Sequence, residues 1–166
     1  MVTRRRKATE VEARALASGI RLRIIRLTYT EALTNKELAQ RLGKDPATTL
    51  HHVRKLVDAG FLAPEPARRG ARGAKEIPYR STGLSWQLDI DQSPDIGNAA
   101  LEAFLAEVAD VGPENVSQLR LVAQVSPERL DEFKQRMQTV LDEFSTEPVD
   151  EDAERTAVYV ALYPSR

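Results

Sequence analysis

The sequence predicts an α+β protein in two parts, and three observations support this prediction. Residues 9–60 show short helical patterns that end at glycines, and a Gly-rich hairpin pattern follows them. Residues 84–163 show longer helical patterns that alternate with strand-like segments. The charge divides near the same place: residues 1–80 hold 18 Lys and Arg against 8 Asp and Glu, a balance of +10, and residues 81–166 hold 6 against 17, a balance of −11. We therefore expect one domain over residues 1–83 and an acidic α+β module over residues 84–166.

The composition excludes several classes of protein. The chain of 166 residues contains no Cys, which excludes disulfides, thiolate metal sites and cysteine nucleophiles. No apolar run approaches the roughly 20 residues that cross a bilayer. The basic residues 4–7 precede no apolar segment of the kind found in a signal peptide. We expect a cytoplasmic protein that contacts no membrane, holds no cofactor and is not an enzyme, because no nucleophile or carboxylate pair stands with a neighbouring His.

The basic half opens with helical patterns over residues 9–18 and 20–27. After them, Thr34 and Glu37 have the spacing of a capping box, which predicts a helix over residues 35–42. Gly43 suits the left-handed residue that ends such a helix. The next helix opens at Asp45-Pro46, with Asp as N-cap and Pro at the first helical position, and stops at Gly60.

This last helix divides into an apolar and a polar face. At about 100° per residue, its inner side gathers Thr49, Val53, Leu56 and Val57, with Leu50 at the margin. The opposite side carries Thr48, His51 and Lys55, with Ala47 and His52 on its flanks. Thr and His can hydrogen-bond base edges or phosphates, Ala47 can contact a thymine methyl group, and Lys55 can reach the DNA backbone. The pattern favours a helix that enters the major groove of double-stranded DNA.

A basic hairpin is predicted directly after this helix. Residues 61–63 and 76–80 flank a Gly-rich turn, and Pro64, Pro66 and Pro78 indicate edge strands. Its tip carries four cations that suit phosphates or a narrow minor groove: Arg68, Arg69, Arg72 and Lys75. An ordinary solvated basic loop is the alternative interpretation. Residues 4–7 could act as a flexible basic arm.

Two helices around a tight Gly-containing turn, followed by a basic hairpin, are the layout of a winged helix-turn-helix. Residues 15–82 resemble ArsR-type winged helix-turn-helix regulators, through residues 16–25, 38–43 and 45–62 and through a closing wing strand over residues 78–82. The resemblance implies a homodimeric, sequence-specific transcriptional regulator, more often a repressor. The family often has a small hydroxyl residue where this chain has Leu50.

We expect no metal site. Metal-sensing members of the family use Cys pairs on the first helix of the motif, or His and acidic ligands on a C-terminal helix, and this chain has no Cys and no His after His52. His51 and His52 are adjacent, so they point about 100° apart on a helix and do not form a pair of metal ligands. They are either DNA-facing or solvated side chains.

The acidic module is predicted as helix, strand, helix and strand, with a further strand over residues 84–90 before it. The helices cover residues 94–111 and 126–144, and the strands cover residues 119–125 and 156–163. The last strand is apolar on both faces, which is typical of a strand buried on both sides. The stripe Leu101, Phe104, Leu105 and Val108 suits a dimer seam or an intrachain core, and the stripe of the second helix suits core or a ligand pocket.

The leading hypothesis is therefore a homodimer that reads a pseudo-palindromic operator through two recognition helices. The acidic module would support dimerisation and could bind a small-molecule effector. The alternative is a winged-helix protein-interaction module that does not bind DNA, which the balance of +10 in residues 1–80 disfavours.

Overall fold

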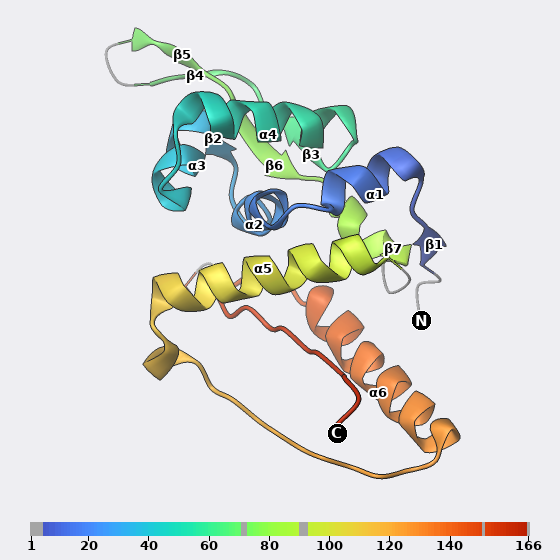
Figure 1. Ribbon diagram of the computed structural model, residues 1–166. Coiled ribbons are helices and arrows are strands. Elements are labelled where there is room, and N and C mark those ends of the chain that lie inside the picture. Colours follow the sequence, from blue (N-terminus) through green and yellow to red (C-terminus); the bar gives the residue numbers. More distant parts are fainter. Residues whose placement is uncertain (1–4, 71–72, 90–92, 151, 166) are drawn as a thin grey trace. The chain divides into compact units, whose positions relative to one another are not determined.

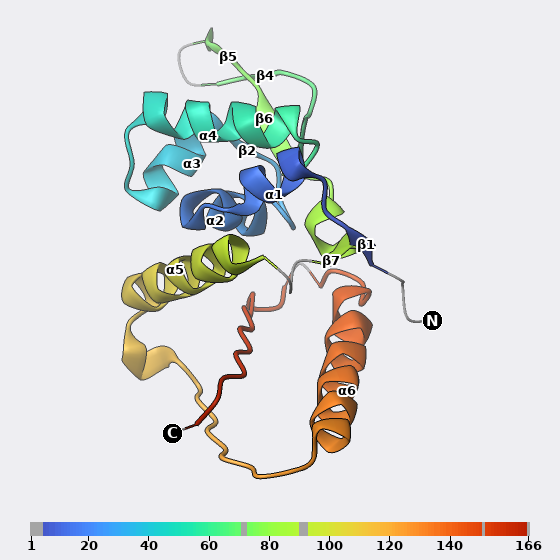
Figure 2. The same ribbon diagram turned by 45° about the vertical axis from the view of Figure 1, so that its right-hand side comes forward.

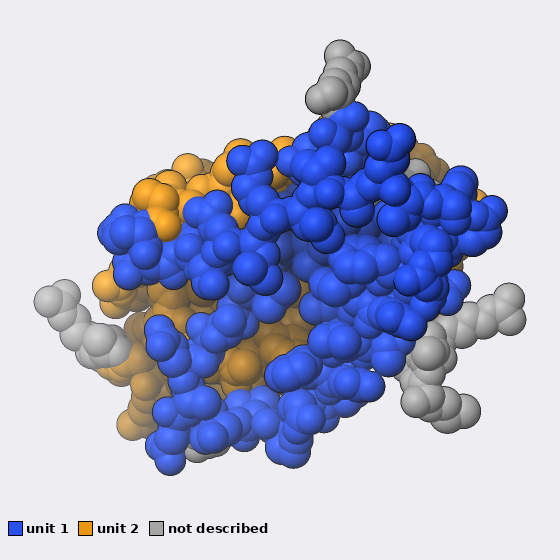
Figure 3. Space-filling model, turned by 90° about the horizontal axis from the view of Figure 1, so that it is seen from below, with its two compact units in different colours: residues 1–2, 114–166 blue, residues 3–113 orange. Residues whose placement is uncertain are grey.

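The computed structural model describes residues 5–70, 73–89, 93–150 and 152–165. The chain divides into two units, coloured orange and blue in Figure 3. We call residues 3–113 (orange, unit 2 in the figure) the first unit, and residues 114–166 with residues 1–2 (blue, unit 1 in the figure) the second, C-terminal unit. The division follows Pro113 rather than residue 83, because the helix over residues 94–111 packs on the N-terminal helices. Among the described residues, no helix is long and apolar enough to cross a membrane.

The first unit contains four short helices ahead of its hairpin: α1 (Glu10–Leu16), α2 (Gly19–Leu27), α3 (Asn35–Leu42) and α4 (Pro46–Asp58). The predicted capping box of α3 is confirmed, since Glu37 N donates to Thr34 Oγ1 (3.3 Å) and Thr34 N donates to the Glu37 carboxylate (2.7 Å). Gly43 ends α3 with φ 59°, in the left-handed region. Asp45 Oδ1 accepts from Ala47 N and Thr48 N at 2.8 and 3.2 Å, as expected of the N-cap of α4.

A three-stranded antiparallel sheet completes the fold, in the order β2-β6-β3. Its strands are β2 (Leu33–Thr34), β3 (Leu62–Pro64) and β6 (Pro78–Ser81), and the hairpin continues through β4 (Arg68–Arg69) and β5 (Lys75–Glu76). The hairpin is confirmed, but β6 is the central strand and not the edge strand that Pro78 suggested. Proline is tolerated there because it is the first residue of the strand.

The core of this unit lies between α1, α2, α3, α4 and the sheet. The fully buried side chains come from every one of these helices and from the start of the hairpin: Leu16, Ile24, Leu38, Val53, Leu56 and Phe61. Their burial fixes the inner face of α4 and leaves its other face to solvent. The unit is thus a winged helix-turn-helix of mixed helices and strands, as the sequence predicts (Figures 1 and 2).

The helix α5 (Pro94–Val111) packs against α2, which lies next to it in both views. Ile96, Ala99 and Ala103 are buried, and α5 pairs its acids with arginines of α2, Arg26 with Glu107 (2.8 Å) and Arg23 with Asp110. The stripe Leu101, Phe104, Leu105 and Val108, which was expected to form a dimer seam or a core, is only partly covered within this unit. Phe104 and Val108 are half-buried, whereas Leu101 and Leu105 are exposed.

The strand expected over residues 84–90 is mostly a 3-10 turn (Leu84–Gln87), followed by the two-residue strand β7 (Leu88–Asp89). Ile90 lies outside the described residues. The turn forms because Gly83 adopts φ 75° and its carbonyl accepts from Trp86 N at 3.1 Å. The short strand β7 pairs in parallel with β1 (Arg6–Lys7).

The second unit has one long helix, α6 (Pro127–Ser145), as expected, with Ser126 Oγ accepting from Arg129 N at 3.4 Å. A short 3-10 turn (Pro113–Asn115) lies at the junction of the two units. The strands predicted over residues 119–125 and 156–163 are not formed in the described residues. A strand requires a ladder partner, and these two segments form no ladder with each other.

Candidate nucleic-acid interface

The outer face of α4 carries the predicted reading residues. Ala47, Thr48, His51 and Lys55 are all exposed. On the opposite side Thr49, Val53 and Leu56 are buried, and Thr49 Oγ1 donates to the Asp45 carbonyl (2.9 Å). The division that the helical wheel predicted is therefore present in the structure. Figures 1 and 2 show α4 on the side of the unit away from α5, with the hairpin β4–β5 projecting beyond it.

His52 differs from the other members of the predicted set, because it is half-buried. Its Nδ1 is buried and has no hydrogen-bond partner among the described residues. Desolvation lowers the pKa of His52, and the neighbouring charges of Arg21, His51 and Lys55 lower it further. His52 is thus a neutral side chain on the flank of α4, and His51 is the histidine that faces solvent.

The turn between α3 and α4 is held by a side chain from the start of α3. Asn35 Nδ2 donates to the Pro46 carbonyl (2.9 Å), which joins the first turn of α3 to the first turn of α4. Together with the caps at Thr34 and Asp45, this contact fixes the start of α4 relative to α3. The N–H groups of Ala47 and Thr48 both donate to the Asp45 carboxylate, and Pro46 has no N–H, so the first turn of α4 has no free N–H group to offer an anion.

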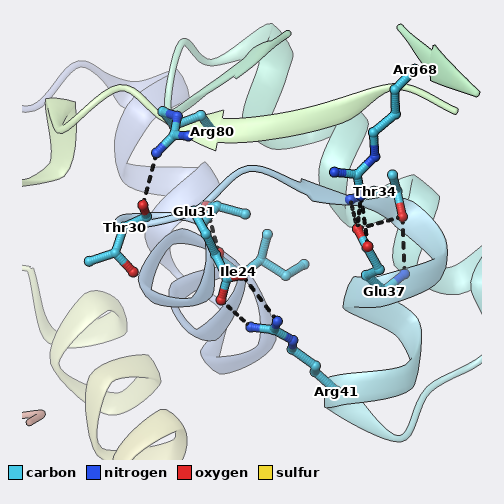
Figure 4. Close-up of polar contacts among 9 residues, drawn as sticks. Ile24, Thr30, Glu31, Thr34, Glu37, Arg41, Arg68 and Arg80 are labelled. Carbon is cyan, nitrogen blue, oxygen red and sulfur yellow. Dashed lines mark hydrogen bonds and ion pairs between the residues drawn. The ribbon is translucent and has the colours of Figure 1, made fainter. Parts of the chain in front are cut away.

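The hairpin places its cations unequally. Arg68 Nη2 donates to both oxygens of Glu37, at 2.7 and 2.8 Å, so this wing residue is bound to α3 (Figure 4). The pKa of Glu37 lies below its usual range, mainly because Thr34 N donates to it and further because of the charges of Arg68 and Arg41. Arg69 and Lys75 are opposite each other in the hairpin register, and both are exposed. Arg72 lies outside the described residues.

Three exposed cations near α4 were missed by the sequence reasoning. Lys36 lies in the first turn of α3, Lys44 lies in the turn before α4, and Arg54 lies on α4. The wheel could have revealed Arg54, which is about 20° from Ala47. None of the three forms an ion pair with a described carboxylate. They extend the positively charged surface toward the helix-turn-helix turn.

Other arginines of the unit are engaged by the protein itself. Arg41 pairs with Glu31 (2.5 Å), which raises the pKa of Arg41. Arg80 donates to Glu65 (2.5 Å). It also donates to the Thr30 carbonyl (3.0 Å), a contact that Figure 4 shows. These contacts fasten the hairpin and α3 to the scaffold. Most of the described cations that pair with no described carboxylate then lie in the first turn of α3, on α4, in the turn before it or on the hairpin.

The expectation of a flexible basic arm at the N-terminus is wrong for its described residues. Arg6 binds both carboxylate oxygens of Glu12, at 2.8 and 2.5 Å, and this bond lowers the pKa of Glu12 to about 2. The Arg5 guanidinium lies 4.7 Å from the centre of the Trp86 ring. Arg4 lies outside the described residues. The sequence could not show that these cations have partners, because Glu12 and Trp86 stand in other elements.

Comparison with known proteins gives a family for part of the chain. A family model described as a helix-turn-helix domain matches residues 16–65. No curated protein matches the sequence significantly.

Similar solved structures include reduced HlyU from Vibrio cholerae N16961, which is 20% identical over 57% of this chain and 84% of that chain, with a TM-score of 0.36. The adhesin competence repressor AdcR from Streptococcus pyogenes is 20% identical over 75% of this chain and 78% of that one (TM-score 0.36). ZitR from Lactococcus lactis, as its C30AH42A mutant in the apo form, is 16% identical over 77% and 83% (TM-score 0.34). The family match is thus to a helix-turn-helix domain over residues 16–65, and the structure adds the hairpin of a winged helix-turn-helix after it.

Proposed function

We propose that this protein is a homodimeric, sequence-specific DNA-binding transcription regulator of the ArsR type, acting as a repressor in the cytoplasm. The observation that carries the proposal is the outer face of α4, where Thr48, His51 and Lys55 are exposed while the inner face is buried in the core. An α-helix with a polar outer face fits the width of the major groove.

Within that groove the residues have different tasks. Thr48 and His51 reach base edges, and Ala47 contacts a thymine methyl group. Lys55 and Arg54 near the end of α4, and Lys44 just before its start, bind phosphates and so fix the position of α4 without reading sequence. Because His52 is half-buried, its contribution is to orient α4, and it contacts DNA less than His51 does.

The hairpin contacts the neighbouring backbone or the minor groove through Arg69 and Lys75, and Arg72 is proposed to join them. Arg68 must exchange the Glu37 carboxylate for a phosphate before it can bind DNA. This exchange keeps the net number of ion pairs of Arg68 constant. Arg68 should therefore add less affinity than Arg69.

A single α4 reads one half-site, so a two-fold dimer reads a pseudo-palindrome with half-sites about 34 Å apart. The acidic C-terminal part of the chain, from residue 84 in the proposed division, supports this dimer and could hold an effector. Its acidity keeps it away from the DNA phosphates.

Selection of duplexes from a random pool by the purified protein, followed by affinity measurements, tests the proposal. Thr48→Ala and His51→Ala should weaken binding to the selected site more than binding to random DNA. Each good base contact is worth about 1–3 kcal/mol of discrimination. Lys134→Ala on α6 removes a cation outside the interface and should change neither affinity. Equal losses on selected and random DNA would show that α4 does not read sequence.

The remaining candidate is a winged-helix module that binds protein and not DNA. It predicts no binding of any duplex at low salt. The unpaired cations around α4 favour DNA, since phosphate contacts supply most of the non-specific affinity of such proteins.

A further inference from the structure

The C-terminal unit has no core of its own. None of the described residues from 114 to 165 is buried. Thirteen large apolar side chains in this stretch are at least 39% exposed, and Leu119 is fully exposed. They are Leu119, Leu121, Val122, Val125, Leu130, Phe133, Val140, Phe144, Val149, Val158, Val160, Leu162 and Tyr163. Such a surface is unusual for a monomer, whose apolar patches rarely exceed a few hundred Å².

Two of the three apolar elements in this unit have the composition of strands. Residues 119–125 and 156–163 are rich in Val, Leu and Tyr. As a strand, residues 156–163 would have largely apolar side chains on both faces, which is the pattern of a strand covered on both sides. The helix α6 presents one apolar stripe, through Leu130, Phe133, Met137 and Val140. One helix covers only part of this apolar surface, so a single copy leaves the rest of it exposed to solvent.

The amount of surface matches a dimer interface. A fully buried aromatic side chain covers roughly 150–250 Å². At about 60–100 Å² for each partly exposed side chain, the thirteen offer on the order of 1,000 Å², against roughly 800 Å² per subunit in a stable complex. The charge pattern also permits self-association. Residues 116–126 and 155–165 contain no Asp or Glu, so two copies can meet there without opposing carboxylates, although residues 81–166 carry a balance of −11.

We propose that residues 119–125 and 156–163 become β-strands only in the dimer, where they pair with the same segments of a second copy of this chain. The intersubunit sheet is covered on one face by α6 of each copy, through the stripe that includes Phe133 and Val140. Antiparallel pairing about a two-fold axis is self-complementary, as an isologous interface requires. The proposal deepens the proposed homodimeric regulator by naming its dimer surface, and it rests on that function only for the use of the dimer.

Hydrogen exchange of the full chain, measured beside sedimentation, tests the strand formation. We expect the amides of both segments to be protected in proportion to the fraction of dimer and to exchange freely when the protein is diluted to monomer. Amides that remain unprotected in the dimer would overturn the proposal. Protection that persists in the monomer would overturn it as well, because the strands would then pair within one chain. A protein that stays monomeric at all concentrations would do the same.

Variants locate the interface. Leu121→Asp and Val160→Asp should each raise the dimer dissociation constant at least tenfold, whereas Gln118→Asp, an exposed polar neighbour, should change it less than twofold. Unchanged dimerisation of both apolar variants would refute the surface. Binding to random duplex DNA, measured on the same proteins, separates the two proposals. A wild-type dimer that binds no DNA would refute the proposed regulator and leave the proposed interface intact. A protein that binds DNA, but whose dimer dissociation constant is unchanged by Leu121→Asp and Val160→Asp, would refute the interface and leave the regulator intact.

Discussion

If Arg68 binds a DNA phosphate as we propose, its contact with Glu37 competes with DNA, and Glu37→Gln should raise the affinity of the protein for duplex DNA. In the structure both Glu37 oxygens accept from Arg68, which holds a wing cation on α3. Gln at this position keeps the capping box of α3, because a Gln side chain can also accept from the Thr34 N–H. The substitution thus removes the charge that binds Arg68 and retains the cap.

The size of the effect follows from the exposure of the pair. The side chains of Arg68 and Glu37 are 47% and 40% exposed, and exposed ion pairs are worth about 0.2–1 kcal/mol. DNA binding must break the pair, so its removal returns that free energy. Because 1.4 kcal/mol corresponds to a tenfold change in a binding constant, affinity should rise about 1.4- to 5-fold. Stability should fall by no more than about 1 kcal/mol.

Fluorescence anisotropy with a labelled duplex at fixed salt measures this gain. Removing any carboxylate near DNA raises affinity somewhat, so the test is a double-mutant cycle with Arg68→Ala. Glu31→Gln is the matched control, since Glu31 forms an exposed pair with Arg41 and not with the wing. If Glu37→Gln gives the same gain in the Arg68→Ala background, the competition that we describe does not occur.

Three further predictions concern the scaffold. Asp45→Ala should lower the free energy of unfolding by about 1 kcal/mol in urea titrations, and Asp58→Ala, at the opposite end of α4, should not lower it. The pKa of Glu12 is lowered from 4.5 to about 2 in the folded state. Its bond to Arg6 therefore stabilises the fold fully above pH 4.5, and this stabilisation is lost as the pH falls toward 2. In Glu12→Gln the free energy of unfolding should depend less on pH over that range. The pKa of His52 is lowered from 6.5, so its neutral form stabilises the fold above that pH, and the stabilisation is lost as the pH falls through the folded pKa. The melting temperature of His52→Gln should therefore fall less below pH 6.5 than that of the wild type.

The helix boundaries of the first unit could be predicted because their signals are local. The cap of α3 needs only Thr34 and Glu37, three residues apart, and the end of α3 needs only Gly43. The two faces of α4 follow from the 3.6-residue period in the same way. Residues within one turn of each other determine these features, so no knowledge of the tertiary fold is required.

The features that could not be predicted depend on partners distant in the chain. Arg68 was expected at the DNA, and its carboxylate partner stands on α3, far earlier in the sequence. The division of the chain also depends on a distant contact, because α5 packs on α2. The strands expected over residues 119–125 and 156–163 have the right composition but form no ladder in the described residues. Amino-acid composition gives a segment its β-propensity, but the segment forms a strand only where another strand can pair with it.

Contacts between residues distant in the chain also make net charge an incomplete guide to DNA binding. Residues 1–80 hold 18 basic side chains, yet several arginines are bound within the unit, Arg6 by Glu12, Arg26 by Glu107 and Arg80 by Glu65. The described cations around the helix-turn-helix turn, α4 and the hairpin that pair with no described carboxylate are Lys36, Lys44, Arg54, Lys55, Arg69 and Lys75.

This smaller set gives a quantitative expectation for salt dependence. If each of these six cations and Arg72 neutralises one phosphate, the logarithm of the binding constant should fall with the logarithm of salt concentration with a slope of about −6 per subunit, since each contact contributes roughly −0.9. A slope near −16 would follow if all the basic residues of this half bound phosphate. Arg69→Ala and Lys75→Ala should each reduce the slope by about 1, and Arg80→Ala should leave it unchanged. A slope that responds equally to all three substitutions would show that exposure and ion pairing in the free protein do not select the cations that meet DNA.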